Sequence, residues 1–232
     1  MAVKLLREGA VARILIDRPA KANALDSPLL DELAAALGTV ESGVRAVVLA
    51  GSGKTFCGGA DVEELERLDH ATAGAFVERI HRVCEALRRL PVPVVARLHG
   101  AVIGAGLEIA AACDLRVAAE GTRFAMPEVR LGIPSVVEAA LLPRLMGSGR
   151  AAWLVLTGEA IDARRAYEWG LIEQVASDLD AAVKSLLEKL LAADPGALAE
   201  QKRLLHVWDD APLKVSIAES IERFAAMPKH RR

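Results

Sequence analysis

Residues 94–114 read VVARLHGAVIGAGLEIAAACD, and the order of apolar residues and glycines in this stretch decides the fold. The apolar run 94–99 predicts a buried strand, and the glycines from Gly100 to Gly106 lead into a helix with the sequence LEIAAAC. A strand followed closely by a helix is the unit of a mixed α/β fold. The start of this helix also presents free N–H groups, which can bind an anion or a carbonyl oxygen.

Elements of both kinds precede this stretch. Two partly alternating apolar runs flank Glu8-Gly9-Ala10 and predict a β-hairpin. Ser27 as N-cap and Pro28 at the first helical position predict a helix over LLDELAAAL. The expected elements, in order, are strands 3–7 and 11–17, the helix from Ser27, strand 44–50 and helix 74–90, which ends at Pro91-Val92-Pro93.

The chain becomes helical after this stretch. Short strands are expected at 115–119, 123–125 and near 172–175, and the rest of the chain beyond Pro134 has helical patterns. No linker or low-complexity segment divides it, so we expect one α/β domain over residues 1–232. Its strand-rich part covers about 1–175, and a helical C-terminal region covers about 176–232.

The composition excludes several classes of protein. With 53% hydrophobic residues in 232, the chain can bury a large core without disulfides or metals. Its 29 basic and 31 acidic residues nearly balance and only 3% of residues are aromatic, which argues against a nucleic-acid partner. Charged residues interrupt the N-terminal apolar run, and no stretch approaches a membrane span of about 20 apolar residues. We expect a cytoplasmic protein that does not enter a membrane.

The cysteines and two glycine-rich segments invite other interpretations. Cys57, Cys84 and Cys113 lack CxxC spacing, so reduced, buried thiols are expected rather than disulfides or a zinc site. Cys57 lies in a glycine-rich loop, and its alternative role is that of a catalytic nucleophile. Residues 53–55 (GKT) resemble the end of a P-loop, but Val48 occupies the position of its first glycine. Gly104-Ala105-Gly106 lacks the third glycine of a dinucleotide fingerprint.

Three segments carry groups that could act together in catalysis. Residues 55–61 (TFCGGAD) form a turn of small residues after a strand, and residues 99–108 join glycines to a helix start. Both can present backbone N–H groups, and two such donors suit an oxyanion hole. Residues 124–134 (FAMPEVRLGIP) place Glu128 among apolar neighbours, which predicts a raised pKa. Glu108, near its helix N-terminus, is expected to ionise more easily and to act as a base.

The motifs FCGGAD, HGAVIGAGLEIAAACD and FAMPEVRLGIP, followed by LTGEAIDARRAYEWGLIEQV, resemble the crotonase superfamily of enoyl-CoA hydratases and isomerases. The resemblance implies a spiral of ββα units with a helical C-terminal region. It implies an oxyanion hole at the N–H groups of Ala60 and Ala105. With glutamates at both 108 and 128, it implies a hydratase in which Glu108 activates water and Glu128 protonates C2. The alternatives are an isomerase or another lyase or decarboxylase of this type, and a catalytically silent acyl-CoA-binding subunit.

The resemblance also implies the partners of the chain. No metal or redox cofactor is implied, and coenzyme A belongs to the acyl-CoA substrate. A homotrimer or a dimer of trimers is implied, and the C-terminal apolar stripe of Trp208, Leu213, Ile217, Ile221 and Phe224 fits such an assembly. The expected coenzyme A contacts are Lys21, Ala22, Lys54, Gly58, Gly59, Asp61 and Gly104, with Lys54 alternatively a solvated loop lysine.

The sequence departs from the family pattern after the second glutamate. Relatives often have glycines after the following proline, whereas this chain has Ser135-Val136-Val137-Glu138. Glu138 is therefore either a third carboxylate of the pocket or a salt-bridged structural residue. Asp114, at the end of the helix that contains Glu108, is expected to bind nearby backbone donors. The acyl pocket is expected to differ from that of typical hydratases.

Overall fold

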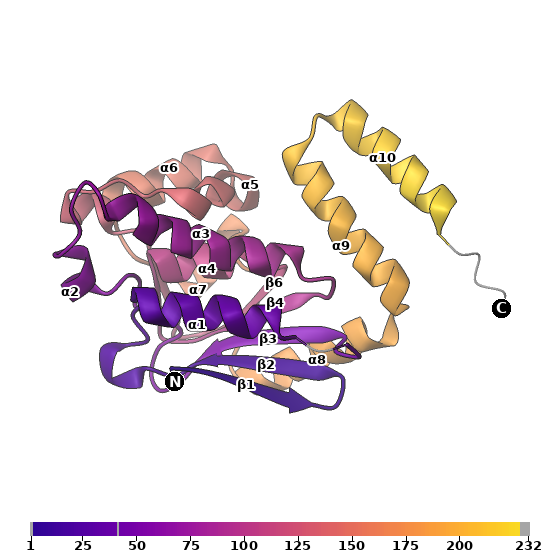
Figure 1. Cartoon of the computed structure of the whole chain (residues 1–232), viewed down its shortest axis with the longest axis horizontal. Coiled ribbons are helices and arrows are strands. Elements are labelled where there is room, and N and C mark those ends of the chain that lie inside the picture. Colours follow the sequence, from indigo (N-terminus) through magenta and orange to yellow (C-terminus); the bar gives the residue numbers. More distant parts are fainter. Residues whose placement is uncertain (1, 41, 228–232) are drawn as a thin grey trace.

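A computed structural model gives the structure of the chain and describes residues 2–40 and 42–227. Its main sheet has six strands in the order β1-β2-β3-β4-β6-β9 (Figure 1). The predicted hairpin is confirmed as an antiparallel pair, and the other neighbours in this sheet are parallel. The strands are β1 (Val3–Glu8), β2 (Val11–Ile16), β3 (Ala46–Gly51), β4 (Val94–Leu98), β6 (Leu115–Ala119) and β9 (Gln174–Ala176).

A second sheet has the order β5-β7-β8, formed by β5 (Ala101–Ile103), β7 (Arg123–Ala125) and β8 (Ile161–Asp162). The chain passes from β4 in the large sheet to β5 in the small sheet and then into helix α4 (Ala105–Ala112). It repeats the step from β6 to β7. This succession is the expected spiral of ββα units. The sequence analysis did not identify β5 and β8, which have three and two residues.

Helices cover both faces of the main sheet (Figure 1). On one face lie α1 (Ser27–Gly38), α3 (Ala73–Arg89) and α4, and on the other lies α8 (Leu179–Ala192). Strand β3 is buried on both sides: Val47 and Leu49 belong to the first core, and Ala46 and Val48 to the second. Burial of both faces explains why this strand is continuously apolar.

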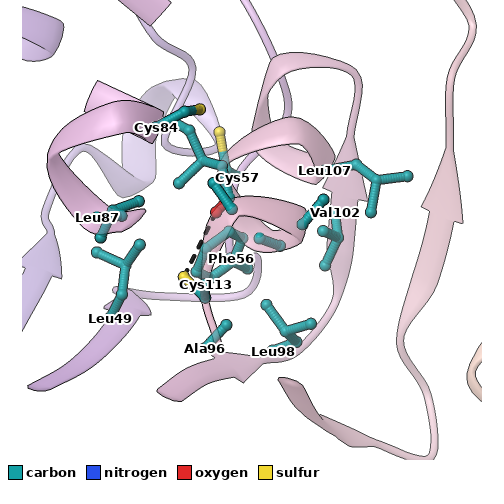
Figure 2. Close-up of a cluster of buried hydrophobic side chains, with 14 of the residues drawn as sticks. Leu49, Phe56, Cys57, Cys84, Leu87, Ala96, Leu98, Val102, Leu107 and Cys113 are labelled. Atoms are coloured by element: carbon teal, nitrogen blue, oxygen red, sulfur yellow. Dashed lines mark hydrogen bonds between the residues drawn. The ribbon is translucent and has the colours of Figure 1, made fainter. Parts of the chain in front are cut away.

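The larger core surrounds the three cysteines (Figure 2). Cys57, Cys84 and Cys113 are buried free thiols, as the sequence predicted. They pack with Phe56 and with leucines and valines of β3, β4, α3 and α4. The Cys113 thiol donates to the carbonyl of Ile109. Packing is therefore the main role of these residues.

The helical C-terminal region is confirmed. Helices α9 (Pro195–Asp210) and α10 (Leu213–Ala226) form an arm that extends from the body (Figure 1). Lys202 of α9 anchors the arm: its buried ammonium pairs with Asp114 at 2.7 Å and donates to the carbonyls of Leu87 and Val92. Asp114 also accepts the N–H of Val94, as expected of a structural residue. The remaining helices are α2 (Val62–Leu65), α5 (Leu142–Met146), α6 (Ser148–Thr157) and α7 (Ala163–Trp169), with 3₁₀ turns η1 (Pro19–Lys21), η2 (Glu128–Leu131) and η3 (Val137–Leu141).

One predicted cap is wrong. The N-cap of α1 is Asp26, whose carboxylate accepts the N–H of Leu29 at 2.9 Å. Ser27 is already helical, and its hydroxyl donates to Glu64 instead. Both residues are good caps, and only the tertiary contact with Glu64 decides between them. Among the described residues, no helix is long and apolar enough to cross a membrane.

Candidate active site

The loop after β3 lies against the glycine-rich segment that contains β5. The N–H groups of Phe56 and Cys57 donate to the carbonyls of His99 and Ala101 at 2.8 and 3.1 Å. In return, the carbonyl of Cys57 accepts the N–H of Ile103 at 3.1 Å. These hydrogen bonds form a parallel bridge between Cys57 and Val102. They bring together two segments that are about 45 residues apart in sequence.

Glycines allow this close approach. A Cβ added at Gly106 would lie 2.7 Å from the Cβ of Cys57, so any side chain there would push the two segments apart. Gly59 has φ +100°, a conformation that other residues rarely adopt, and a Cβ there would lie 3.0 Å from the carbonyl oxygen of Ile103. Gly59 of FCGGAD and Gly106 of GAG are thus required by packing.

Two backbone N–H groups border the pocket that results. Ala105 is the first residue of α4, where a helical N–H has no partner within the helix. Ala60 lies in the opposite loop, in a bridge with Leu25. Among the described residues, no hydrogen bond uses the N–H of Ala60 or Ala105. Two donors at one cavity can bind a carbonyl oxygen and the negative charge that develops on it.

The cavity has a volume of about 120 Å³. Glu108 and Glu128 both line it, together with the two proposed N–H donors. Its other lining is largely apolar and includes Phe76, Val77, Ile80, Ile103, Leu131, Ile133 and Val136. An apolar pocket with a few converging polar groups is the usual form of a small-molecule site.

Glu108 lies in the first turn of α4 and is only 4% exposed. Its Oε1 accepts the N–H of Ala139 at 3.1 Å. Burial raises its pKa to about 8, the charge of Glu128 adds to this effect, and the bond from Ala139 opposes it. The expectation that Glu108 ionises easily is therefore wrong, because burial outweighs the helix N-terminus.

Glu128 begins η2 and is less buried than Glu108. Its Oε2 accepts the hydroxyl of Ser135 at 3.0 Å. Its other carboxylate oxygen lies against Gly104, where an added Cβ would be 2.3 Å from Oε1. Gly104, at φ +50°, therefore makes room for this carboxylate. The Glu128 side chain is oriented by a hydroxyl on one side and a glycine on the other.

Glu138 is a salt-bridged residue, in agreement with one of its two sequence interpretations. It is 7% exposed, and its Oε1 lies 2.7 Å from Nδ1 of His81 on α3. Its Oε2 is buried without a hydrogen-bond partner among the described residues. The sequence did not indicate His81 or Ser135, because neither belongs to a recognisable motif.

The expected coenzyme A residues fall into two groups. Gly58, Gly59 and Gly104 line the cavity. Lys21 and Ala22 lie at the surface beside the 53–58 loop, since the carbonyl of Ala22 accepts the N–H of Gly58 at 2.9 Å. Lys54 is exposed on this loop, and Lys21 pairs with Glu63. Both lysines lie at the surface, and the loop that carries Lys54 continues into Gly58 in one wall of the cavity.

Asp61 is engaged in structure. Its carboxylate caps α2 and pairs with Arg18 at 2.8 Å. Burial alone would raise its pKa, but the hydrogen bond from Arg18 and the capped N–H groups bring the net pKa below its ordinary value. The role of this residue is to fix the loop that carries Ala60.

Asn23 supports the same loop, and the sequence did not single it out. It is fully buried, and its amide donates to the carbonyls of Ser52, Thr55 and Phe56. Its φ of +56° explains an asparagine here, because Asn tolerates the left-handed region better than most residues. A polar residue in the segment before the first helix was the available signal.

Cys57 is not built as a nucleophile. Burial raises the pKa of its thiol to about 12, so almost no thiolate forms near neutral pH. Its thiol donates to the carbonyl of Asn23 at 3.2 Å. The packing interpretation of this cysteine is the correct one.

Known proteins share this architecture. The family model described as enoyl-CoA hydratase/isomerase matches residues 7–231. The short-chain-enoyl-CoA hydratase of Clostridium acetobutylicum is 35% identical over 228 residues, which cover 96% of this chain and 87% of that protein. The crystal structure of an enoyl-CoA hydratase from Mycobacterium smegmatis superposes with a TM-score of 0.94 at 32% identity, covering 97% of this chain and 90% of that one.

A further solved structure contains coenzyme A. It is a putative enoyl-CoA hydratase from Thermobifida fusca in complex with CoA, with a TM-score of 0.85 and 33% identity. The match covers 97% of this chain and 92% of that chain. The likeness extends over nearly the whole length of both proteins.

Proposed function

Because this chain belongs to the enoyl-CoA hydratase/isomerase family, we propose that it is an enoyl-CoA hydratase, a lyase that adds water across the 2,3 double bond of an enoyl-CoA or catalyses the reverse dehydration. One observation carries the proposal: two glutamates, Glu108 and Glu128, line a single cavity. An isomerase needs one carboxylate to move a proton, whereas hydration needs both an acceptor and a donor.

The proposed mechanism gives each group one task. The thioester oxygen accepts the N–H groups of Ala60 and Ala105, which stabilise the negative charge that develops when water attacks C3. Glu108 accepts a proton from the attacking water, and Glu128 gives its proton to C2, using the electron pair of the former double bond. The proposed mechanism places both groups on one face of the double bond, which makes the addition syn. The cycle closes when a proton passes from Glu108 back to Glu128.

The raised pKa of Glu108 suits this task. A general base is most effective when its pKa lies near the working pH, since it is then both ionised and strongly basic. With a pKa of about 8, the carboxylate of Glu108 is a much better proton acceptor than an exposed glutamate. Burial makes Glu108 harder to ionise than the sequence predicted. For the same reason, the ionised Glu108 carboxylate is a stronger base.

The proposal extends to substrate and assembly. The small apolar cavity favours a short acyl chain, and Lys21 and Lys54 are the cations proposed to face the coenzyme A phosphates. The reaction moves only water and protons, so no metal or redox cofactor is needed beyond the coenzyme A of the substrate.

A trimer or dimer of trimers would cover the apolar face of the α9–α10 arm. The buried thiols suit a reducing compartment such as the cytoplasm.

The test uses crotonyl-CoA, a short enoyl-CoA, and the full chain. Hydration removes the conjugated enoyl absorbance, and the 3-hydroxyacyl product is identified by mass spectrometry as a gain of one water. Turnover with saturation supports the proposal. If crotonyl-CoA and longer enoyl-CoAs bind without being hydrated, the chain is an acyl-CoA-binding protein. If instead a 3-enoyl-CoA is converted to its 2-enoyl isomer without hydration, it is an isomerase.

A further inference from the structure

A third carboxylate, that of Glu138, lies near the proposed catalytic pair. Glu138 lies in η3, which packs against both α4 and α3. The next residue, Ala139, donates its N–H to Glu108, while the Glu138 carboxylate pairs with His81 on α3. The η3 segment thus binds Glu108 through the backbone N–H of Ala139 and binds His81 through the carboxylate of Glu138.

We propose that Glu138, paired with His81, is a positioning residue for Glu108: it holds the segment that binds Glu108 and sets how readily that carboxyl gives up its proton. This inference rests on the proposed function, in which Glu108 is the base. The Glu138 carboxylate lies 2.7 Å from Nδ1 of His81 and also acts on the Cys84 thiol of the same helix, so its contacts tie η3 to α3.

Backbone strain supports a positioning role. Val137 has φ +40°, in the left-handed region that is costly for a β-branched residue. Residues held in such conformations gather at functional sites, where the surroundings enforce them. Here the strained residue directly precedes Glu138 and Ala139. The contacts of these two residues with His81 and Glu108 are the interactions that the strained turn makes possible.

The charges around the segment give Glu138 a direct influence on Glu108. The Glu138 carboxylate acts to raise the pKa of Glu108, after burial and the larger effect of Glu128. The hydrogen bond with Glu138 raises the pKa of His81. The other groups acting on the unit are Cys84, Glu78 and Glu85 of α3. Arg144 of α5, the remaining helix packed against η3, pairs with Asp210 instead.

The direction of the effect follows. Removing a negative charge near a carboxyl makes that carboxyl ionise more easily. Without the Glu138 charge, Glu108 should lose its proton at lower pH and become a weaker base. The variant Glu138→Gln removes the charge and keeps a side chain that can still bond to His81. Glu138→Met, an apolar side chain of similar length, makes the same test if the Gln variant does not fold.

The experiment measures the ionisation of Glu108 in two ways. The first is the pH dependence of kcat/KM for crotonyl-CoA. The second is carboxyl-carbon NMR of the free protein, with the Glu108 signal assigned by its loss in Glu108→Gln. Both midpoints are expected at lower pH in Glu138→Gln than in the parent. The control Glu168→Gln removes an equal charge from α7, where the exposed Glu168 pairs with Arg164, and should leave both midpoints nearly in place.

A second comparison separates positioning from general support of the fold. If Glu138 acts through Glu108, its substitution has no further effect on residual activity once Glu108 is already glutamine. Equal losses in both backgrounds, or a Glu108 midpoint that stays unchanged in Glu138→Gln, would overturn the inference. If the parent protein does not hydrate enoyl-CoAs, the proposed function fails, yet the NMR titration still decides whether Glu138 controls Glu108.

Discussion

Glu108 and Glu128 share a cavity but differ in their surroundings. Glu108 is buried and bonded to a backbone N–H, whereas Glu128 is partly exposed and bonded to the hydroxyl of Ser135. Two carboxylates in unlike environments can divide acid and base work between them. At the residue scale, the two glutamates therefore differ in burial and in hydrogen-bond partner.

Substitution of either glutamate by glutamine should lower crotonyl-CoA hydration by about 10²-fold or more, the usual scale for loss of an acid or base. The double variant should be little worse than the worse single variant, because the two groups act on one water. Steady-state kinetics with circular dichroism as a folding control make the measurement. Retained double-bond migration in Glu108→Gln, together with its loss in Glu128→Gln, would favour an isomerase.

The pH dependence of hydration should reflect Glu108. Its pKa of about 8 means that the carboxyl is mostly protonated at lower pH and cannot accept a proton from water. We therefore expect kcat/KM, which reports the free enzyme, to fall as pH decreases through about 8. A pH–rate profile in buffers of constant ionic strength checks this. Activity that is independent of pH from 6 to about 9 would contradict the assignment of Glu108 as the base.

At the scale of elements, α4 supplies both a carboxylate and a backbone donor. Glu108 and the N–H of Ala105 come from the same first turn, so the orientation of one helix positions both. The loop after β3 supplies the second donor, Ala60, and is fixed by Asn23 and Asp61. The candidate oxyanion hole therefore depends on how two elements meet.

Replacing Ala105 by proline removes one of the two donors at a helix position that proline tolerates. Loss of one oxyanion donor costs about 3 kcal/mol in the transition state, so turnover should fall by about 10²-fold or more. The matched control is Ser148→Pro at the exposed first residue of α6, which also follows a glycine. Kinetics of both folded variants make the comparison. Normal turnover in folded Ala105→Pro would refute the role of this N–H.

At the scale of the whole molecule, the α9–α10 arm exposes an apolar face. Phe224 is 81% exposed, and Leu213, Ile217 and Ile221 are also exposed along α10. Monomeric proteins rarely leave a contiguous apolar patch of this kind uncovered. Lys202, buried against Asp114, fixes the arm to the body, so the face is presented in a defined direction.

For the proposed trimer or dimer of trimers, light scattering should give a mass of three or six times 24.6 kDa. The double variant Ile221→Glu with Phe224→Glu should yield a smaller species, because it places charges on the apolar face of α10. The control Lys214→Glu changes a charge on the same helix without altering an apolar residue. A parent protein that stays monomeric at micromolar concentration would contradict the proposed assembly.

The sequence by itself determined the fold class, the order of most elements and the residues of the candidate site. Continuous apolar runs such as 44–50 predict buried strands because both their faces must avoid water. The motifs FCGGAD and GAGLE could be recognised because close backbone packing leaves room only for glycine. These are local requirements, and local requirements can be read from the order of residues.

Only the tertiary structure decided the chemistry of the carboxylates. The sequence predicted an easily ionised Glu108, but α3, α4 and η3 pack so tightly that its burial raises its pKa to about 8. The pairing of His81 with Glu138 joins residues 57 positions apart, and Asp26 rather than Ser27 caps α1 because Glu64 binds the serine. Burial and electrostatic coupling depend on neighbours that are distant in sequence, and for this reason no local pattern reveals them.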